Sequence, residues 1–247
     1  MVKILYLVPG LMGKEEQVRR EKIANKFVSP NTIVEVRAVE SGPVSIESAV
    51  EEDIAAGEVL KAIVRFQDNY DVIVLGCAGD PGLRAARELS KIPVVGPAEA
   101  TIAFSSIIGD RYGIIVPLGR DIPTFRVLAT KYGFEHRLAS IVPLNIPVLD
   151  LGKDISLIKT KLIEACGKAK DQGAEVVILG CMSLAFILAD ELVKENVQVP
   201  ILNPAKVSLR VAEMLAFFKI GHSRLSYPMA DYRKLAESVF KGELKIE

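Results

Sequence analysis

Two cysteines occupy matching places in the sequence, and their surroundings indicate shared chemistry. Cys77 ends the run DVIVLGC and Cys181 ends EVVILGC, so each follows four apolar residues and a glycine. Short apolar runs bounded in this way predict strands that are buried on both faces of a parallel sheet. Open α/β sheets bind ligands at the carboxyl ends of their strands. We therefore expect both thiols at a ligand-binding edge.

Two converging thiols have three ordinary uses. A disulfide is disfavoured in the cytoplasm. A zinc site needs four ligands, and neither His136 nor His222 lies near a strand end that carries a cysteine. In acid–base chemistry, one thiolate removes a proton from carbon and the other thiol returns one to the opposite face. A helix expected directly after each cysteine favours the thiolate through its unpaired N–H groups. We predict Cys77 and Cys181 as the catalytic pair and expect no metal.

An inert role for these cysteines is the alternative, because free cysteine is a common small core residue. That role suits Cys166, which lies within an expected helix on its apolar face. If it also applied to Cys77 and Cys181, the chain would be a non-catalytic, two-lobed protein that binds a small molecule.

Alternating strands and helices must position the two thiols. The pattern predicts a βαβαβαβ unit, which restarts after residue 97, and the segments IPVVGPA and VPILNPA close the two halves. Expected strands lie at 4–8, 32–39, 72–75, 92–97, 112–116, 137–142 and 176–179, and expected helices at 15–27, 49–67, 81–90, 123–132, 155–170 and 182–194.

The repeated order of strand ends, cysteines and prolines indicates a duplication. We predict an α/β fold of two pseudo-symmetric doubly wound lobes, each with a mainly parallel four-stranded sheet, with the active site in the cleft between them. Lobe one would comprise residues 1–97 and 205–247 and carry Cys77, and lobe two would comprise 98–204 and carry Cys181.

Composition excludes several classes of partner. Basic and acidic residues balance at 31 each and Trp is absent, so we expect no nucleic acid and no membrane partner. No GxGxxG or P-loop occurs, and no cofactor is expected. We expect a cytoplasmic homo-oligomer with a small-molecule substrate. The prevalence of Lys, Arg and Glu among the charges leans towards a thermophile.

Residues beside the cysteines are the next candidates. We expect Asp80 to cap the helix that follows it or to tune Cys77. The backbone amides of Ala78, Gly79, Met182 and Ser183 are expected to hold substrate carbonyl groups, because N–H groups at a helix start stabilise developing negative charge. Both histidines are expected at the surface.

Four segments resemble the hydantoin racemase family of the aspartate/glutamate racemase superfamily. They are GPVSIES (42–48), GCAGDPGL (76–83), PVVGPAEA (93–100) and GAEVVILGC (173–181), and the resemblance extends over about residues 4–211. It implies a cofactor-independent racemase with two bases, Cys77 and Cys181, between two doubly wound lobes.

The residues around the cysteines depart from the family's patterns. Aspartate and glutamate racemases carry Thr beside each cysteine, where this chain has Ala78 and Met182. Hydantoin racemases usually have Phe in place of Ala78, Ala-Gly in place of Met182-Ser183 and Asn-Pro-Asn in place of residues 8–10. A Thr usual after the first strand of lobe two is Pro117. The resemblance therefore supports the reaction type more than the substrate.

We predict racemisation or epimerisation at a carbon next to a carbonyl, in a 5-substituted hydantoin or a related cyclic ureide. An amino-acid racemase of the Asp/Glu type and a maleate-isomerase-like enzyme are the alternatives within the superfamily. The residues expected to bind substrate are Pro9, Gly10, Gly42, Ala78, Gly79, Asp80, Pro117, Leu118, Met182 and Ser183.

Overall fold

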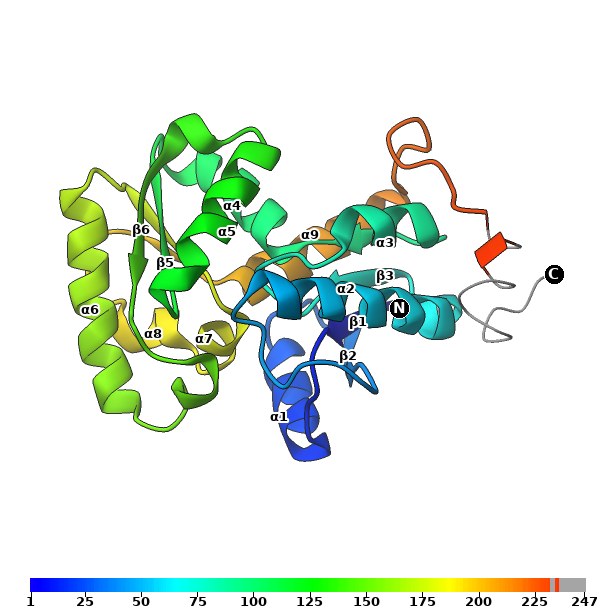
Figure 1. The fold of residues 1–247 in the computed structure, drawn as a ribbon, viewed down its shortest axis with the longest axis horizontal. Coiled ribbons are helices and arrows are strands. Elements are labelled where there is room, and N and C mark those ends of the chain that lie inside the picture. The colour runs from blue at the N-terminus through cyan, green and yellow to red at the C-terminus, as the bar shows by residue number, and fades with distance from the viewer. Residues whose placement is uncertain (232–233, 236–247) are drawn as a thin grey trace.

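The computed structural model describes residues 1–231 and 234–235 and contains two lobes, each built on one sheet (Figure 1). All strand pairs are parallel, and the strand order is β2-β1-β3-β4 in the first sheet and β6-β5-β7-β8 in the second. The predicted pair of doubly wound sheets is thereby confirmed. The strands are β1 (Val2–Val8), β2 (Thr32–Ala38), β3 (Val72–Leu75), β4 (Val94–Val95), β5 (Tyr112–Val116), β6 (Leu138–Pro143), β7 (Val176–Leu179) and β8 (Ile201–Leu202).

Helices cover both faces of each sheet. Lobe one contains the first sheet with α1, α2, α3 and α9, and lobe two contains the second sheet with α4 to α8. The helices are α1 (Lys14–Ala24), α2 (Ala49–Phe66), α3 (Leu83–Leu89), α4 (Pro97–Ile108), α5 (Ile122–Lys131), α6 (Ile155–Asp171), α7 (Met182–Phe186), α8 (Ala189–Val193) and α9 (Pro204–Phe218), with short 3₁₀ turns at η1 (Gln67–Asn69), η2 (Gly119–Asp121), η3 (Glu135–Arg137) and η4 (Val148–Asp150).

Side-chain caps fix where the long helices begin. The hydroxyl of Ser48 accepts a hydrogen bond from the N–H of Glu51 at the start of α2. Asp154 accepts one from Leu157 at the start of α6, and Asn203 accepts two at the start of α9. Each acceptor satisfies donors that a helix start leaves without partners.

The inward faces of the two sheets share one hydrophobic core. It includes alternate residues of β1 and β3 from lobe one and of β5 and β7 from lobe two. The ring of Tyr6 contacts that of Phe186 edge to face across the lobes, with centroids 5.3 Å apart. Because apolar burial is the dominant favourable term in folding, this shared core holds the lobes together.

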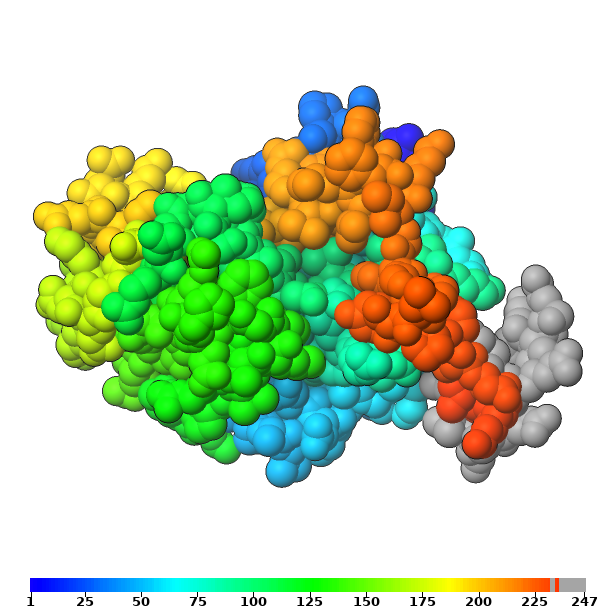
Figure 2. Space-filling model, turned by 90° about the horizontal axis from the view of Figure 1, so that it is seen from above, coloured from blue at the N-terminus to red at the C-terminus, as the bar shows by residue number. Residues whose placement is uncertain are grey.

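The chain returns to lobe one through α9, which contacts β1, β3, β4 and α4. The segment that follows crosses the outside of α3 (Figure 2). There the N–H of Ala230 donates to the carbonyl of Glu88, and Arg224 donates to the carbonyls of Arg87 and Ser90. The domain boundaries near 97 and 205 stay a prediction, and residues 232–233 and 236–247 of the expected lobe one lie outside the described residues.

The structure differs from the sequence-based expectation at two helices. Residues 97–108 form α4, which the sequence pattern does not predict. The expected helix at 182–194 is divided into α7 and α8, because Leu188 adopts a left-handed conformation with φ of +57°. Among the described residues, no helix combines the length and the apolar character needed to cross a membrane.

Candidate active site

The two cysteines stand at equivalent points of the two sheets. Cys77 follows β3 and Cys181 follows β7, each directly after a glycine whose N–H donates to the neighbouring central strand. Gly76 donates to the carbonyl of Leu7 at 2.6 Å, and Gly180 to that of Ile115 at 2.7 Å. The two strands therefore end in the same register, and each places its thiol at the carboxyl edge of its sheet.

Close approach of the neighbouring strand requires glycine at both positions. A Cβ on Gly76 would lie 2.8 Å from the Tyr6 ring and 2.9 Å from the Leu7 carbonyl oxygen. A Cβ on Gly180 would lie 2.9 Å from the Ile115 carbonyl oxygen. The Gly-Cys pairs read from the sequence thus have the same packing cause in both lobes.

Both thiols line one cavity of about 790 Å³ that is bounded by both lobes. Cavities of this size are typical of sites for small organic molecules. The ionised form of Cys181 raises the pKa of Cys77, so the two sulfurs lie within electrostatic reach of each other. The predicted convergence of Cys77 and Cys181 on one cleft matches this arrangement, whereas their catalytic roles stay a prediction.

Seven of the ten residues expected to bind substrate line the same cavity. They come from the strand ends and the turns after them, and they are Pro9, Gly10, Ala78, Gly79, Pro117, Met182 and Ser183. The other three, Gly42, Asp80 and Leu118, are not among the residues that line it.

Two of the three residues outside the lining shape loops. Gly42 has a φ of +124°, which favours glycine, and lies against the side chain of Glu58 on α2. The N–H of Leu118 donates to the carboxylate of Asp121 at 2.9 Å, and its carbonyl accepts from the N–H of the same residue at 3.1 Å. Leu118 therefore fixes the turn that leads into α5.

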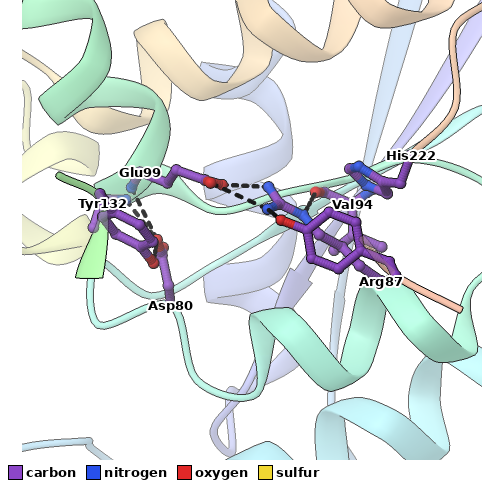
Figure 3. A network of polar contacts seen from close by, with 8 residues as sticks. Asp80, Arg87, Val94, Glu99, Tyr132 and His222 are labelled. Atoms are coloured by element: carbon purple, nitrogen blue, oxygen red, sulfur yellow. Dashed lines mark hydrogen bonds and ion pairs between the residues drawn. The ribbon is translucent and has the colours of Figure 1, made fainter. Parts of the chain in front are cut away.

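Asp80 serves a helix other than the expected one. Its carboxylate accepts hydrogen bonds from the N–H groups of Ala98 and Glu99 at the start of α4, at 3.0 and 2.9 Å. The Tyr132 hydroxyl donates to it at 2.7 Å (Figure 3). The expectation that Asp80 caps the following helix α3 is wrong, because its side chain points to α4. Burial raises the pKa of Asp80 to about 6, and these donors oppose that shift.

A chain of polar contacts continues behind Asp80. Glu99 forms an ion pair with the buried Arg87, which donates to the Val94 carbonyl and to the Tyr227 hydroxyl (Figure 3). The Nε2 atom of His222 accepts from the N–H of Val94 at 2.7 Å. Burial lowers the pKa of His222 to about 4. His222 is therefore only partly exposed, and its ring serves the backbone of β4, whereas His136 is exposed as expected.

Cys77 has an environment that favours the thiol form. Burial raises its pKa to about 12, and one hydrogen bond from the Gly79 N–H, at 3.4 Å, acts in the opposite direction. The charges of Asp80 and Glu52 raise the pKa further. The turn from 78 to 82 separates Cys77 from α3, so the helix start does not follow it directly as expected.

Cys181 has more groups that favour the thiolate. It is 8% exposed and occupies the N-cap position of α7, where its side chain makes no capping hydrogen bond. Burial dominates and raises the pKa of Cys181, while the N–H groups of Leu184 and Ser183, the charge of Arg20 and the Ser183 hydroxyl act in the opposite direction. By contrast, burial alone raises the pKa of Cys166 to about 12, and this residue lies on the buried face of α6, as expected.

Charged residues of α1 and α2 complete the cavity wall, and sequence reasoning missed them. Glu16, Arg19 and Arg20 lie on α1 and Glu52 lies on α2. The Nε atoms of Arg19 and Arg20 pair with Glu16 at 2.6 and 2.8 Å. Their spacing of three and four residues from Glu16 is the signal for these pairs. Such pairs usually mark a solvated helix face, and only the fold turns this one towards a cavity.

Metal-binding residues do not gather in the described part of the chain. No three His, Cys, Asp or Glu side chains there form a group that could hold a metal ion. The three cysteines are all free thiols.

Comparison with known proteins places this architecture among racemases. The model of the family described as Asp/Glu/Hydantoin racemase matches residues 19–212. A hydantoin racemase of Paenarthrobacter aurescens is 34% identical over 198 residues, which cover 78% of this chain and 82% of that protein. An allantoin racemase from Klebsiella pneumoniae superposes with a TM-score of 0.85 at 29% identity and covers 94% of each chain. An allantoin racemase from Pseudomonas fluorescens superposes with a TM-score of 0.87 at 23% identity, over 93% of this chain and 97% of that one. At this identity, the similarity supports the fold and nothing further.

Proposed function

This chain belongs to the Asp/Glu/Hydantoin racemase family, and from that premise we propose that it is a cofactor-independent racemase of 5-substituted hydantoins or related cyclic ureides. The observation that carries the proposal is the placement of Cys77 and Cys181 on one cavity, each supplied by a different lobe. Two bases on opposite sides of a carbon are what inversion of a stereocentre requires.

The proposed reaction moves one proton on each side of the ring carbon C5. One cysteine thiolate takes the proton from C5, so that the C–H bond breaks, an S–H bond forms and the electron pair passes to the adjacent carbonyl as an enolate. The other thiol then protonates C5 on the opposite face and becomes the thiolate. The roles of Cys77 and Cys181 are exchanged for the opposite enantiomer.

Backbone donors beside the cysteines are suited to hold the enolate oxygen. The N–H of Gly79 donates to the sulfur of Cys77, and the N–H of Ser183 acts on the sulfur of Cys181. We therefore assign the substrate carbonyl groups to the N–H groups of Ala78 and Met182, which line the cavity next to the thiols. Fixed donors at the developing negative charge lower the barrier without reorganisation.

Apolar side chains in the cavity lining could contact a substituent on the hydantoin ring. Val44, Ile46, Val148, Leu149 and Ile155 line the cavity from both lobes. Apolar side chains at these positions favour a 5-substituent with apolar surface. Allantoin is a hydantoin with a ureido group at C5 and belongs to the same chemical class. Two of the similar structures are allantoin racemases.

The test follows a single enantiomer of 5-benzylhydantoin in deuterated water by polarimetry and proton NMR, with allantoin assayed in parallel. We expect the rotation to fall to zero and C5 to take up deuterium at matching rates, well above those in enzyme-free buffer. Rates equal to the buffer control for every hydantoin tried would refute the substrate class. Activity on aspartate or glutamate instead would place the chain in the amino-acid branch.

A further inference from the structure

Arg20 is a buried cation that reaches from one lobe to the other. It lies on α1 of lobe one, is 8% exposed and lines the cavity. Its Nη2 atom donates to the hydroxyl oxygen of Ser183 at 3.3 Å, and its guanidinium lies 5.1 Å from the centre of the Phe186 ring. Ser183 and Phe186 belong to α7, which begins directly after Cys181. Arg20 therefore acts on the cysteine of the opposite lobe.

The positive charge of Arg20 is only partly balanced. Its Nε atom pairs with Glu16 at 2.8 Å, but Arg19 pairs with the same carboxylate at 2.6 Å. The cluster thus holds two guanidinium groups and one carboxylate, and Arg20 is its buried member. A charge acts more strongly at low dielectric, so the remaining positive potential is felt most on the buried side.

The groups that surround the two thiols differ in sign. Cys181 is acted on by Arg20, the Ser183 hydroxyl and two backbone N–H groups. Cys77 has one backbone donor, Gly79, and the acidic side chains of Asp80 and Glu52. Burial raises the pKa of the Tyr6 hydroxyl, the charge of Arg20 lowers it, and the charges of both cysteines raise it. The two lobes therefore present one thiol to positive charge and the other to negative charge.

We propose that Arg20 is a positioning residue that makes Cys181 the first of the two thiols to ionise, so that the singly ionised enzyme carries its thiolate on Cys181 and its thiol on Cys77. Arg20 does this through its bond to Ser183 and through its charge, without contact with the reacting carbon. The catalytic consequence rests on the proposed racemase function: the enantiomer whose C5 proton faces Cys181 is deprotonated without prior proton transfer.

Thiol alkylation tests the order of ionisation. We would treat the protein with iodoacetamide from pH 6 to 12 and measure the labelling of each cysteine by peptide mass spectrometry. The midpoint of each pH profile reports ionisation, whereas its plateau also reports access. We expect the midpoint of Cys181 to lie below that of Cys77. Cys77 labelling with the lower midpoint in the unaltered protein would overturn the proposal, whatever the behaviour of the variants.

Variants at Arg20 then separate charge from packing. Arg20→Gln should lower the labelling rate of Cys181 at pH 7 about tenfold, which corresponds to a midpoint about one pH unit higher, and should leave the Cys77 profile unchanged. Arg20→Lys keeps the charge and should restore most of the rate. A shift of both cysteines together, or no shift at Cys181, would show a purely structural role.

Arg19→Gln is the matched control, because Arg19 shares Glu16 with Arg20 but donates to the carbonyl of Phe186. It should leave the Cys181 midpoint in place, and an equal shift would assign the effect to the cluster and not to Arg20. Labelling needs no substrate. A wrong order of ionisation would therefore refute the role of Arg20, whereas inactivity in the hydantoin assay would refute the proposed substrate class. Circular dichroism of each variant confirms that it is folded.

Discussion

The two lobes are alike in backbone and unlike in the chain that follows each cysteine. Their strand order, the glycine before each thiol and the hydrogen bond of that glycine to the neighbouring strand agree. After Cys181 the chain enters α7 at once, whereas after Cys77 it makes a turn in which Asp80 and Gly82 have left-handed conformations. A duplicated scaffold thus fixes the geometry of both thiols, and the local turn decides the charge around each one.

The ends of the two sheets show the same division. Gly96 begins α4 without a side chain to cap it, and the cap comes from Asp80 on another loop. The matching residue in lobe two is Asn203, which caps α9 with its own side chain. A Cβ on Gly96 would lie 2.5 Å from the Asp80 carboxylate. A side chain at position 96 and the Asp80 carboxylate therefore cannot both occupy the start of α4. Equivalent helices therefore receive an ionisable cap in one lobe and a neutral one in the other.

Loss of either thiol should have the largest effect. Cys77→Ser and Cys181→Ser should each lower racemisation of a hydantoin by about 10³-fold, because positioned acid–base groups contribute 10² to 10⁴. Each variant retains one base and should exchange the C5 proton of one enantiomer only, with opposite preference in the two variants. Cys166→Ala serves as the control and should keep the rate within about twofold. Exchange of the same enantiomer by both variants would contradict two opposed bases.

The glycines before the cysteines should be equally intolerant of a side chain. Gly76→Ala and Gly180→Ala should each destabilise the fold by about 2–3 kcal/mol, since the added carbon overlaps a backbone carbonyl in both lobes. Gly57→Ala on the exposed side of α2 has open space and should stabilise by about 0.5–1 kcal/mol. Urea unfolding measures all three. A large difference between Gly76→Ala and Gly180→Ala would break the equivalence of the strand ends.

The two helix caps should differ in their response to pH. The pKa of Asp80 is raised to about 6 in the folded chain, against about 3.9 when unfolded. Between these values the folded chain keeps a proton that the unfolded chain has released. The stability that Asp80 contributes is therefore present at pH 4 and is lost as the pH rises through 6, by up to about 3 kcal/mol.

Thermal unfolding at pH 4 and pH 7 checks this difference. The stability advantage of the unaltered protein over Asp80→Asn should shrink from pH 4 to pH 7. The advantage over Asn203→Ala should change less, because the amide itself does not titrate, although it also donates to the Asp190 carboxylate at 2.8 Å. A parallel response of the two variants would show that Asp80 does not hold its proton in the folded state.

The smallest effect is expected at Tyr6, whose position in lobe two is occupied by Ile114. The Tyr6 hydroxyl is buried and has no hydrogen-bond partner among the described residues. Removing a polar group without a partner costs little, so Tyr6→Phe should change stability by less than about 1 kcal/mol, with a gain expected. A loss above that value in urea unfolding would mean that the hydroxyl is held by Arg20.

The sequence allowed the strand ends to be predicted because buried parallel strands have a strong signature. Val72–Leu75 and Val176–Leu179 are apolar at every position, and both were expected at their observed bounds. The cysteines and seven neighbouring residues of the cavity follow from those strand ends. These residues can be predicted from their positions next to the strand ends, without knowledge of the tertiary contacts between side chains.

Helix α4 escaped prediction because its buried side mixes apolar residues, such as Ala98 and Ile102, with polar ones. Its buried side carries Thr101 and Ser105, whose hydroxyls donate to carbonyls of the same helix. Its exposed side carries Phe104 and Ile107. A pattern that expects apolar residues to be inward finds no amphipathic helix here. The satisfied hydroxyls remove the usual cost of burying polar groups.

Residues that act across the lobes could not be predicted from local pattern. Arg20 and Ser183 are far apart in the sequence, and only the packing of α1 beside α7 brings them together. Asp80 gives the same lesson, because its motif indicates a local cap whereas its carboxylate serves a helix that begins after the next strand. Ionic and capping partners of this kind depend on the tertiary arrangement.

The paired crossings between the lobes have a mechanical consequence. In the predicted division, the chain leaves lobe one between β4 and α4 and returns between β8 and α9, and α4 and α9 lie against each other. We expect two adjacent connections to act as one hinge, about which the lobes would rotate more easily than they would slide. On that expectation, one angle would govern the separation of the two sulfurs, and the core shared by the lobes would restrain it.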